Sequence, residues 1–243
     1  METTIQERLD TINDRIQRAC DRVGRDYREV NLVAVSKTHP PAIVSEVSTY
    51  GVTVFGESKV QEAKAKIAMC PGHLTWHLVG HLQTNKAHHA VQLFDMIHSV
   101  DSLKLLESLA QATDRAGKNI AACIEVNVSG EGSKYGIKEE ELPGILEAST
   151  QFPHIDLVGL MTIPPWSEET DKTRRYFAKL RALRDRCRDD WNFPLDELSM
   201  GMSHDFEIAI EEGATWIRVG SSLFGSRETA RPREEKSVPN SKF

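Results

Sequence analysis

Apolar residues recur along the chain in two patterns, one with a period of three to four residues and one of short unbroken runs. The first pattern occupies residues 5–23, and Gly24 follows it as a C-cap, so the chain is predicted to open with an amphipathic helix. The second pattern occurs eight times, mostly followed by residues at helical spacing. The predicted strands are residues 32–36, 52–55, 75–79, 94–100, 120–128, 157–163, 196–200 and 216–219.

Eight strand-then-helix units with short connections predict an α/β protein, a closed (β/α)8 TIM barrel preceded by one extra helix. The alternative is an open doubly wound sheet, which normally binds a nucleotide through a glycine-rich loop after its first strand. That place holds the run SKTHP instead. We expect residues 1–227 to form this single domain. Residues 228–243 are charged and contain two prolines, which predicts a disordered tail.

Composition and charge exclude several classes of protein. The net charge of −6, without a basic stripe, argues against a nucleic-acid partner. No segment approaches the roughly twenty apolar residues that cross a bilayer, and the N-terminus has no apolar signal region, so we expect a cytoplasmic protein. The four cysteines stand far apart without a C-x-x-C pair, which predicts reduced, mostly buried thiols and no structural zinc site.

The end of the first predicted strand carries a lysine, Lys37. Parallel α/β folds place their chemistry at the carboxyl ends of strands, and a lysine whose stem lies in an apolar pocket can lose its proton and attack an aldehyde. A closed barrel places strand eight beside strand one, so Arg218 and Lys37 are expected to be neighbours.

The turns after strands seven and eight read MGMS and VGSS, and both suit a phosphate. Gly201 and Gly220 allow backbone amides to approach an anion, while Ser203 and Ser221 add hydroxyl groups. Such turns also serve as plain N-caps and barrel corners. A ligand with a phosphate, an aldehyde for the lysine and a ring nitrogen for the arginine is pyridoxal 5'-phosphate, PLP.

Over residues 32–227 the sequence resembles a known family, the YggS/PROSC pyridoxal phosphate homeostasis proteins. The runs that carry the resemblance are AVSKTHP, FGESKVQE, WHLVGHLQTNK, VNVSGEGSKYGI, GLMTIP and LSMGMSHDFEIAIEEGATWIRVGSSLFGSR. The resemblance implies a single barrel similar to the N-terminal domain of alanine racemase. It also implies that Lys37 holds PLP as an internal aldimine and that Arg218 faces the pyridine nitrogen.

By the same resemblance, Ser203, Gly220 and Ser221 bind the phosphate. Ser58 stands where the family commonly has the asparagine of F-G-E-N-Y, and a serine hydroxyl reaches less far than that amide. The full set of expected cofactor-binding residues is Lys37, Ser58, Met202, Ser203, Arg218, Gly220 and Ser221.

An arginine at the pyridine nitrogen cannot accept a proton and opposes a second positive charge, so the ring is a weak electron sink. Alanine racemase shares such an arginine and adds a catalytic tyrosine from the C-terminal domain of its partner subunit. Only sixteen residues follow Arg227, too few for such a domain. We therefore expect a carrier or regulator in intracellular PLP homeostasis with little or no amino-acid turnover, not an enzyme. Its expected partners are PLP and the PLP-dependent apoenzymes that receive it, with no membrane partner, and its expected state is a monomer or weak dimer.

Two other functions stay open at this stage. A Schiff-base lyase or aldolase, or a weak amino-acid racemase, would share Lys37 and the phosphate turns, although no obvious acid–base pair accompanies the lysine. A metal hydrolase would use the histidines at 77, 81, 88 and 89. His77 and His81 are four residues apart but lie across a strand end and Gly80, so they need not share a face. Hydrogen bonding at the barrel rim is therefore preferred and no metal site is expected.

Three further residues have two possible roles each. Lys134, in the glycine-rich loop after strand five, either contacts or accepts the cofactor or is simply solvated. Met161 and Ile163, at the end of strand six, either wall the ring or belong to the core, and the core is the preferred interpretation.

Overall fold

Eight parallel strands close into a barrel in their sequence order, with β8 paired to β1. This computed structural model describes residues 3–225. The closure confirms the predicted (β/α)8 barrel and excludes the open sheet. The strands are β1 (Asn31–Val35), β2 (Val54–Glu57), β3 (Thr75–Leu78), β4 (Met96–Val100), β5 (Ile120–Glu125), β6 (Ile155–Met161), β7 (Glu197–Met202) and β8 (Trp216–Val219).

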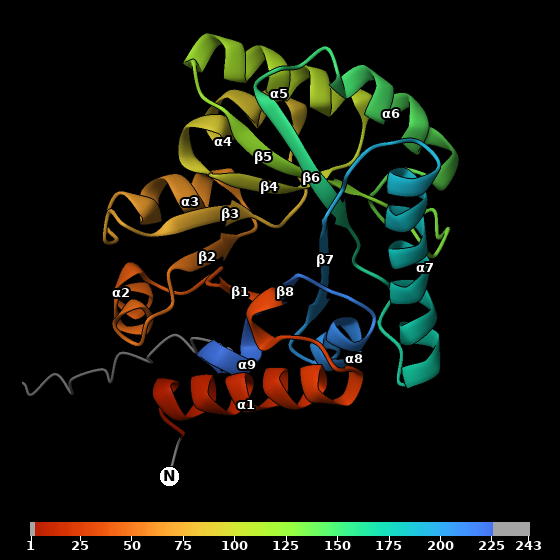
Figure 1. Ribbon diagram of the computed structural model, residues 1–243. Coiled ribbons are helices and arrows are strands. Elements are labelled where there is room, and N and C mark those ends of the chain that lie inside the picture. The colour runs from red at the N-terminus through yellow and green to blue at the C-terminus, as the bar shows by residue number, and fades with distance from the viewer. Residues whose placement is uncertain (1–2, 226–243) are drawn as a thin grey trace, which may run out of the picture.

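Helices surround the strands as an outer ring (Figure 1). The helices are α1 (Ile5–Val23), α2 (Pro41–Thr49), α3 (Val60–Ile67), α4 (Ala87–Leu93), α5 (Leu103–Ala116), α6 (Leu142–Ser149), α7 (Thr170–Asp189), α8 (Phe206–Glu211) and α9 (Ser221–Phe224). Short 3-10 turns are η1 (Tyr27–Glu29), η2 (Thr84–Lys86) and η3 (Glu139–Glu141). The predicted tail, residues 228–243, lies outside the described residues.

Strand β5 is shorter than the apolar run 120–128 predicts. Val126 leaves the strand and forms an isolated bridge with Ile137, and the amide of Asn127 donates to the Ile137 carbonyl at 2.9 Å. The apolar residues beyond Glu125 are therefore buried in a loop that folds back over the barrel, not in the sheet. A run of buried residues alone does not distinguish these two cases.

The opening helix α1 forms as predicted. Thr4 caps it in a reciprocal pair with Glu7, and Gly24 ends it in the left-handed conformation with φ of 67°. The helix lies beside α8 and α9 (Figure 1), and Arg15 pairs with Glu207 of α8 at 2.8 Å. The extra helix therefore covers the side of the barrel where the last and first strands meet.

Alternate strand positions face either the barrel interior or the helices. In β1, Ala34 packs into the outer layer, whereas Val33 and Val35 pack with Val79 inside the barrel. A second interior cluster contains Met96, Cys123 and Met161. Met161 is thus a core residue, which was the preferred interpretation.

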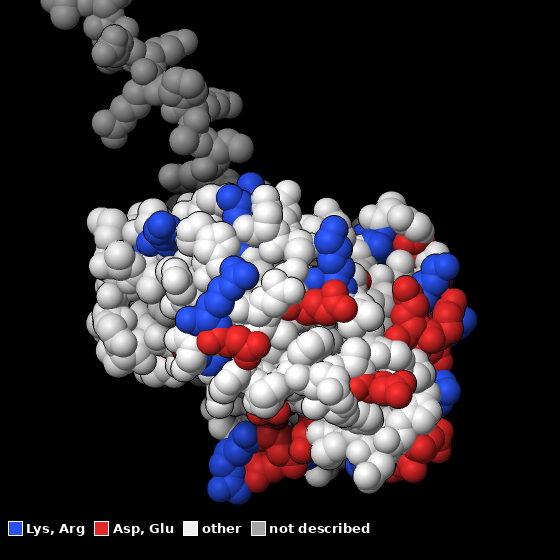
Figure 2. Space-filling view, turned by 90° about the horizontal axis from the view of Figure 1, so that it is seen from above, with Lys and Arg blue, Asp and Glu red and all other residues white. Residues whose placement is uncertain are grey.

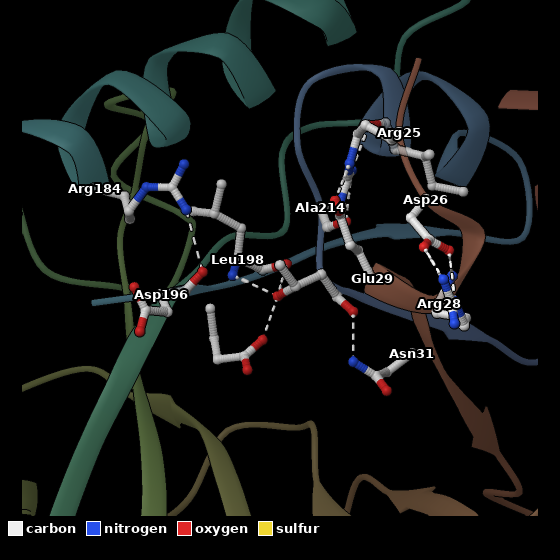
Figure 3. A network of polar contacts seen from close by, with 12 residues as sticks. Arg25, Asp26, Arg28, Glu29, Asn31, Arg184, Asp196, Leu198 and Ala214 are labelled. Carbon is white, nitrogen blue, oxygen red and sulfur yellow. Dashed lines mark hydrogen bonds and ion pairs between the residues drawn. The ribbon is translucent and has the colours of Figure 1, made fainter. Parts of the chain in front are cut away.

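Polar contacts tie together the amino ends of several strands (Figure 3). The Arg25 guanidinium donates through Nη1 to the carbonyls of Ile210, at 2.7 Å, and Ala214, at 3.0 Å. Asn31 Nδ2 donates to the carbonyl of Thr215 at 3.2 Å. These bonds join the chain after α1 to the turn between α8 and β8, so one end of the barrel is closed by satisfied backbone groups.

The described surface carries mixed charge. On the face drawn in Figure 2, Lys and Arg side chains are interspersed with Asp and Glu side chains. Within residues 3–225 no helix combines the length and hydrophobicity needed to cross a bilayer. The four cysteines are free, and three of them, Cys20, Cys123 and Cys187, are buried, as expected.

Candidate functional site

A cavity of about 480 Å³ opens at the carboxyl ends of the strands. Its lining comes from residues at or beyond the ends of β1, β2, β3, β5, β6, β7 and β8. The structure brings together on this cavity all seven residues predicted to bind a cofactor, although their binding role stays a prediction. They are Lys37, Ser58, Met202, Ser203, Arg218, Gly220 and Ser221. Ile163 lines the same cavity, unlike the buried Met161.

Lys37 lies in the turn directly after β1, and its side chain is exposed. The next residue, Thr38, adopts a φ of 70°, a left-handed conformation that costs energy for a residue with a branched side chain. Among the described residues no hydrogen bond or ion pair engages the Lys37 amine. The amine is therefore open to a ligand that enters the cavity.

Arg218 is a residue of β8 whose buried side chain lines the cavity. It pairs with Val33 of β1, as the closure predicts, and is only 4 % exposed. Its Nη1 donates to Ser199 Oγ at 2.6 Å and its Nη2 to the Thr162 carbonyl at 2.9 Å. Burial lowers the pKa of Arg218 to about 10, against the attraction of Glu125, so the guanidinium stays charged at neutral pH.

The hydrogen bond from Arg218 to Ser199 is the first of a buried series of hydrogen bonds. Since a guanidinium only donates, Ser199 accepts from it and offers its own hydroxyl proton to His98 Nδ1 at 2.6 Å. His98 Nε2 then donates to His77 Nδ1 at 3.0 Å. Burial lowers the pKa of His77 to about 4 and that of His98 well below its ordinary value. Both imidazole rings are neutral at pH 7, so this series of hydrogen bonds holds Arg218 in place without adding a charge.

On the β7–β8 side, a hydroxyl and two backbone amides converge. Ser203 Oγ accepts from the amides of Gly220, at 3.2 Å, and Ser222, at 3.3 Å. A side chain on Gly220 would place its Cβ 3.3 Å from the Val35 carbonyl. Phosphate oxygens accept from hydroxyl and amide groups of this kind, and a bound phosphate would replace Ser203 Oγ as the acceptor of these amides.

The structure gives Gly201 a packing role, and its predicted approach to an anion stays a prediction. Gly201 is buried within β7 and is not among the residues that line the cavity. Its φ is 92°, and a Cβ there would lie 2.6 Å from Ala209 Cβ and 2.9 Å from Phe206 Cα. Close packing of α8 against β7 therefore requires a glycine here.

Two groups that the sequence did not single out for acid–base chemistry lie on the other side of the mouth. His81 Nδ1 bonds to Asp101 Oδ2 at 2.8 Å, and the imidazole stacks on Tyr135, 4.0 Å between ring centroids. Glu125, which ends β5, is 5 % exposed, and burial raises its pKa to about 7. The signal available in the sequence was position, because Asp101 and Glu125 follow or end buried strands.

The remaining candidates do not join the cavity. Lys134 is exposed in the loop after β5 and is not a lining residue, although Tyr135 beside it is. His77 is inside the barrel, whereas His88 and His89 contact each other on α4. Across residues 3–225 no three His, Cys, Asp or Glu side chains are grouped as metal ligands.

Comparison with known proteins defines the class first. The family described as "Alanine racemase, N-terminal domain" matches residues 8–228, nearly the whole chain. Together with the closed barrel and its carboxyl-end cavity, this match places the chain in that family of (β/α)8 barrels.

The relatives narrow the class. A protein of Aquifex aeolicus named "Pyridoxal phosphate homeostasis protein" is 44 % identical over 226 residues, covering 91 % of this chain and 98 % of the relative. A human protein of the same name is 36 % identical over 252 residues, covering 96 % and 91 %. PipY of Synechococcus elongatus, solved with PLP bound, is 39 % identical with a TM-score of 0.82, covering 91 % and 100 %. The chain belongs to the pyridoxal phosphate homeostasis protein family.

Proposed function

We propose that this protein binds PLP in the cavity at the barrel mouth and acts in the cytoplasm as a carrier or regulator of the cofactor. The observation that supports this most is the set of groups on the cavity. An amine, a buried guanidinium and serine–glycine turns line it, and no Asp or Glu is among its described lining residues. These groups fit a ligand with a phosphate and an aldehyde.

Each lining group has a role in this proposal. PLP would supply an aldehyde that can condense with the Lys37 amine to an imine, that is, a Schiff base, with loss of one water molecule. Ser203, Gly220 and Ser221 hold the phosphate, and Ser58 and Met202 complete the contacts. The names of the relatives and the PLP-bound PipY structure support the same ligand.

The proposal favours binding over turnover because of how Arg218 is held. Its guanidinium is anchored by Ser199 and the Thr162 carbonyl, stays charged, and has no site to accept a proton from a ring nitrogen. An unprotonated ring withdraws electrons weakly, so amino-acid chemistry gains little. We propose PLP-dependent apoenzymes as recipients and a monomer or weak dimer as the working state.

One observation supports a second candidate, a slow racemase or lyase activity. His81 lines the same cavity as Lys37 and is bonded to Asp101 behind it, which is the kind of acid–base pair such an activity needs. Incubation of the PLP-loaded protein with amino acids, with product chirality measured by chromatography, tests this. Turnover at ordinary enzyme rates, about 1–1000 per second, would replace the carrier proposal.

Borohydride reduction followed by peptide mapping tests the main proposal. The protein is loaded with PLP, reduced and digested, and the pyridoxyl label is located by mass spectrometry. We expect the label on Lys37, and neither on Lys134 nor on the exposed Lys59, which serves as the internal control. A label confined to another lysine, or no label, would refute the proposed site.

A further inference from the structure

A buried lysine beneath the Lys37 turn has no role in the function proposed so far. Lys66, on the inner face of α3, is only 5 % exposed. Its Nζ donates to the Ser36 carbonyl at 2.7 Å, to Glu57 Oε1 at 2.6 Å and to Glu62 Oε1 at 3.1 Å. Three acceptors satisfy the three protons of the ammonium group.

The network formed by Lys66, Glu57 and Glu62 holds the backbone on both sides of Lys37. On the side before it, the Ser36 carbonyl accepts from Lys66, and Ser36 Oγ donates to Glu57 Oε1 at 2.7 Å. On the side after it, the amide of Thr38 donates to Glu62 Oε1 in a short hydrogen bond. Of Ser36, Lys37 and Thr38, Lys37 is thus the one with no described hydrogen bond to Lys66, Glu57 or Glu62.

Burying the charged groups of this network costs free energy, so the network contributes little to the stability of the fold. Glu57 is fully buried, and among the described residues its Oε2 has no hydrogen-bond partner. Burial raises the pKa of the Glu57 carboxyl, against its bonds to Lys66 and Ser36. A buried ion pair often contributes no more stability than apolar side chains of the same volume. The network also maintains Thr38 in its left-handed conformation, and such local strain is frequent at functional sites.

We propose that Lys66 is a positioning residue, which with Glu57 and Glu62 fixes the Ser36–Thr38 turn so that the Lys37 amine meets the PLP aldehyde. The inference deepens the proposed function and rests on it. Lys66 itself is not among the described residues that line the cavity. Its action passes through the backbone of the turn.

Substitution of Lys66 with methionine, K66M, tests the inference with two ligands. PLP can form an imine with Lys37, whereas pyridoxamine 5'-phosphate has an amine in place of the aldehyde and reports only the phosphate and ring contacts. We expect K66M to bind PLP at least about tenfold more weakly, because small displacements of a reacting group have large effects. Its affinity for pyridoxamine 5'-phosphate should stay within about twofold of the original.

The matched control is K64M, which removes an exposed lysine two residues earlier on the same helix. It should leave both affinities unchanged. An equal loss of both affinities in K66M would show general structural damage and overturn the inference, as would no loss of either. Absorbance of the imine at saturating PLP measures the fraction of bound PLP that is linked to Lys37. This absorbance should fall in K66M and not in K64M.

A second variant keeps the test decisive if K66M does not fold. E62A removes an acceptor that is partly exposed and leaves the buried pair of Lys66 and Glu57 intact. Without any cofactor, hydrogen exchange at the Thr38 amide should accelerate by at least about threefold, because one hydrogen bond is lost. The neighbouring Q61A, at an exposed position, is the control.

The two readouts separate the two proposals. Unlabelled Lys37 in the unaltered protein refutes the proposed function, whereas unchanged Thr38 exchange in E62A refutes the positioning network whatever the ligand. Faster exchange in E62A together with a selective loss of PLP binding supports both.

Discussion

At the amino end of the barrel, charged groups lie near the surface and are paired, whereas at the carboxyl end several are buried in or beside the cavity. Asp26, near the first end, accepts hydrogen bonds from Arg28, which lower its pKa to about 2. Glu125, at the second end, is buried, which raises its pKa to about 7. Two carboxyl groups of one barrel are thus shifted in opposite directions by opposite environments.

The cavities at the two ends differ in the same way. One of about 350 Å³ lies between α1 and the amino ends of β1 and β2, and its described lining contains no Lys, Arg, His, Asp or Glu. The larger one at the mouth contains Lys37 and the buried Arg218. The amino end therefore stabilises the fold, whereas the carboxyl end carries groups whose burial costs stability and which the proposed function would use. Substitutions at the two ends should separate stability from ligand binding.

The largest effect is expected for K37A at the mouth. Removing the amine removes the covalent link, so retention of PLP should fall at least about 100-fold. The free energy of unfolding without cofactor should hardly change, because the Lys37 side chain is exposed and makes no described contact. Dialysis of the loaded protein with absorbance detection measures retention, and urea unfolding measures stability.

The control for K37A is K59A, an exposed lysine outside the lining. It should match the unaltered protein in both measurements. Equal retention in K37A and K59A would contradict the assignment of the amine.

The reverse result is expected at the amino end for R25A. The substitution leaves the carbonyls of Ile210 and Ala214 without their charged donor, which should cost about 1.5–3 kcal/mol of the free energy of unfolding. PLP affinity should stay the same, because the cavity lies at the other end. The control is R28A, whose guanidinium pairs, among residues 3–225, with Asp26 alone at the surface, and which should leave the urea midpoint unchanged. A large loss of PLP affinity in R25A would show that the two ends are coupled.

Most of the barrel is predictable from the sequence because its strands are short apolar runs with turn signals at their ends. Residues 216–219 are predicted and observed as β8 without a shift. The prediction is less accurate where burial continues past the strand. At 126–128 the apolar residues are buried by contact with a loop, and this pairing over a distance leaves no local pattern.

The residues that line the site are predictable, but the groups that hold them are not. Lys37 and Arg218 can be inferred because strand ends converge at the mouth and β8 neighbours β1. The hydrogen bond from Ser199 to His98 joins residues 101 positions apart. Serine and histidine are both common in protein cores, so neither residue signals this contact in the sequence. Closure of the barrel brings Ser199 and His98 together. The roles of Ser199 and Lys66 therefore follow from geometry alone.

The carboxyl group of Glu125 gives a pH-dependent prediction for E125Q. Its folded pKa is about 7 and its ordinary value 4.5, so below pH 4.5 it is neutral in both states. As the pH rises from 4.5 to 7, the unfolded chain releases the proton first, and the protein loses stability. Glutamine stays neutral, so E125Q should gain stability over the original as the pH rises, by about 3 kcal/mol at pH 8, because each unit of pKa difference corresponds to about 1.4 kcal/mol.

Urea unfolding at pH 4.5 and pH 8 measures this difference. The control is E131Q, an exposed glutamate in the following loop, whose difference from the original should not depend on pH in this way. A gain in E125Q that is equal at both pH values would mean that folding leaves the pKa of Glu125 unchanged, and a gain that shrinks as the pH rises would mean that folding lowers it, as at Asp26.

The smallest effect is expected at Ser58, where the chain departs from the family's asparagine. The backbone here is held close to Gly80, since a Cβ on that glycine would lie 2.5 Å from the Ser58 carbonyl, so the side chain alone changes. In S58N a longer amide extends along the cavity and can donate to the ligand, which should tighten PLP binding severalfold, the worth of about one hydrogen bond. S58A, which removes the hydroxyl, should weaken it by a similar factor. Titration with PLP measures both, and equal affinities in all three proteins would remove Ser58 from the site.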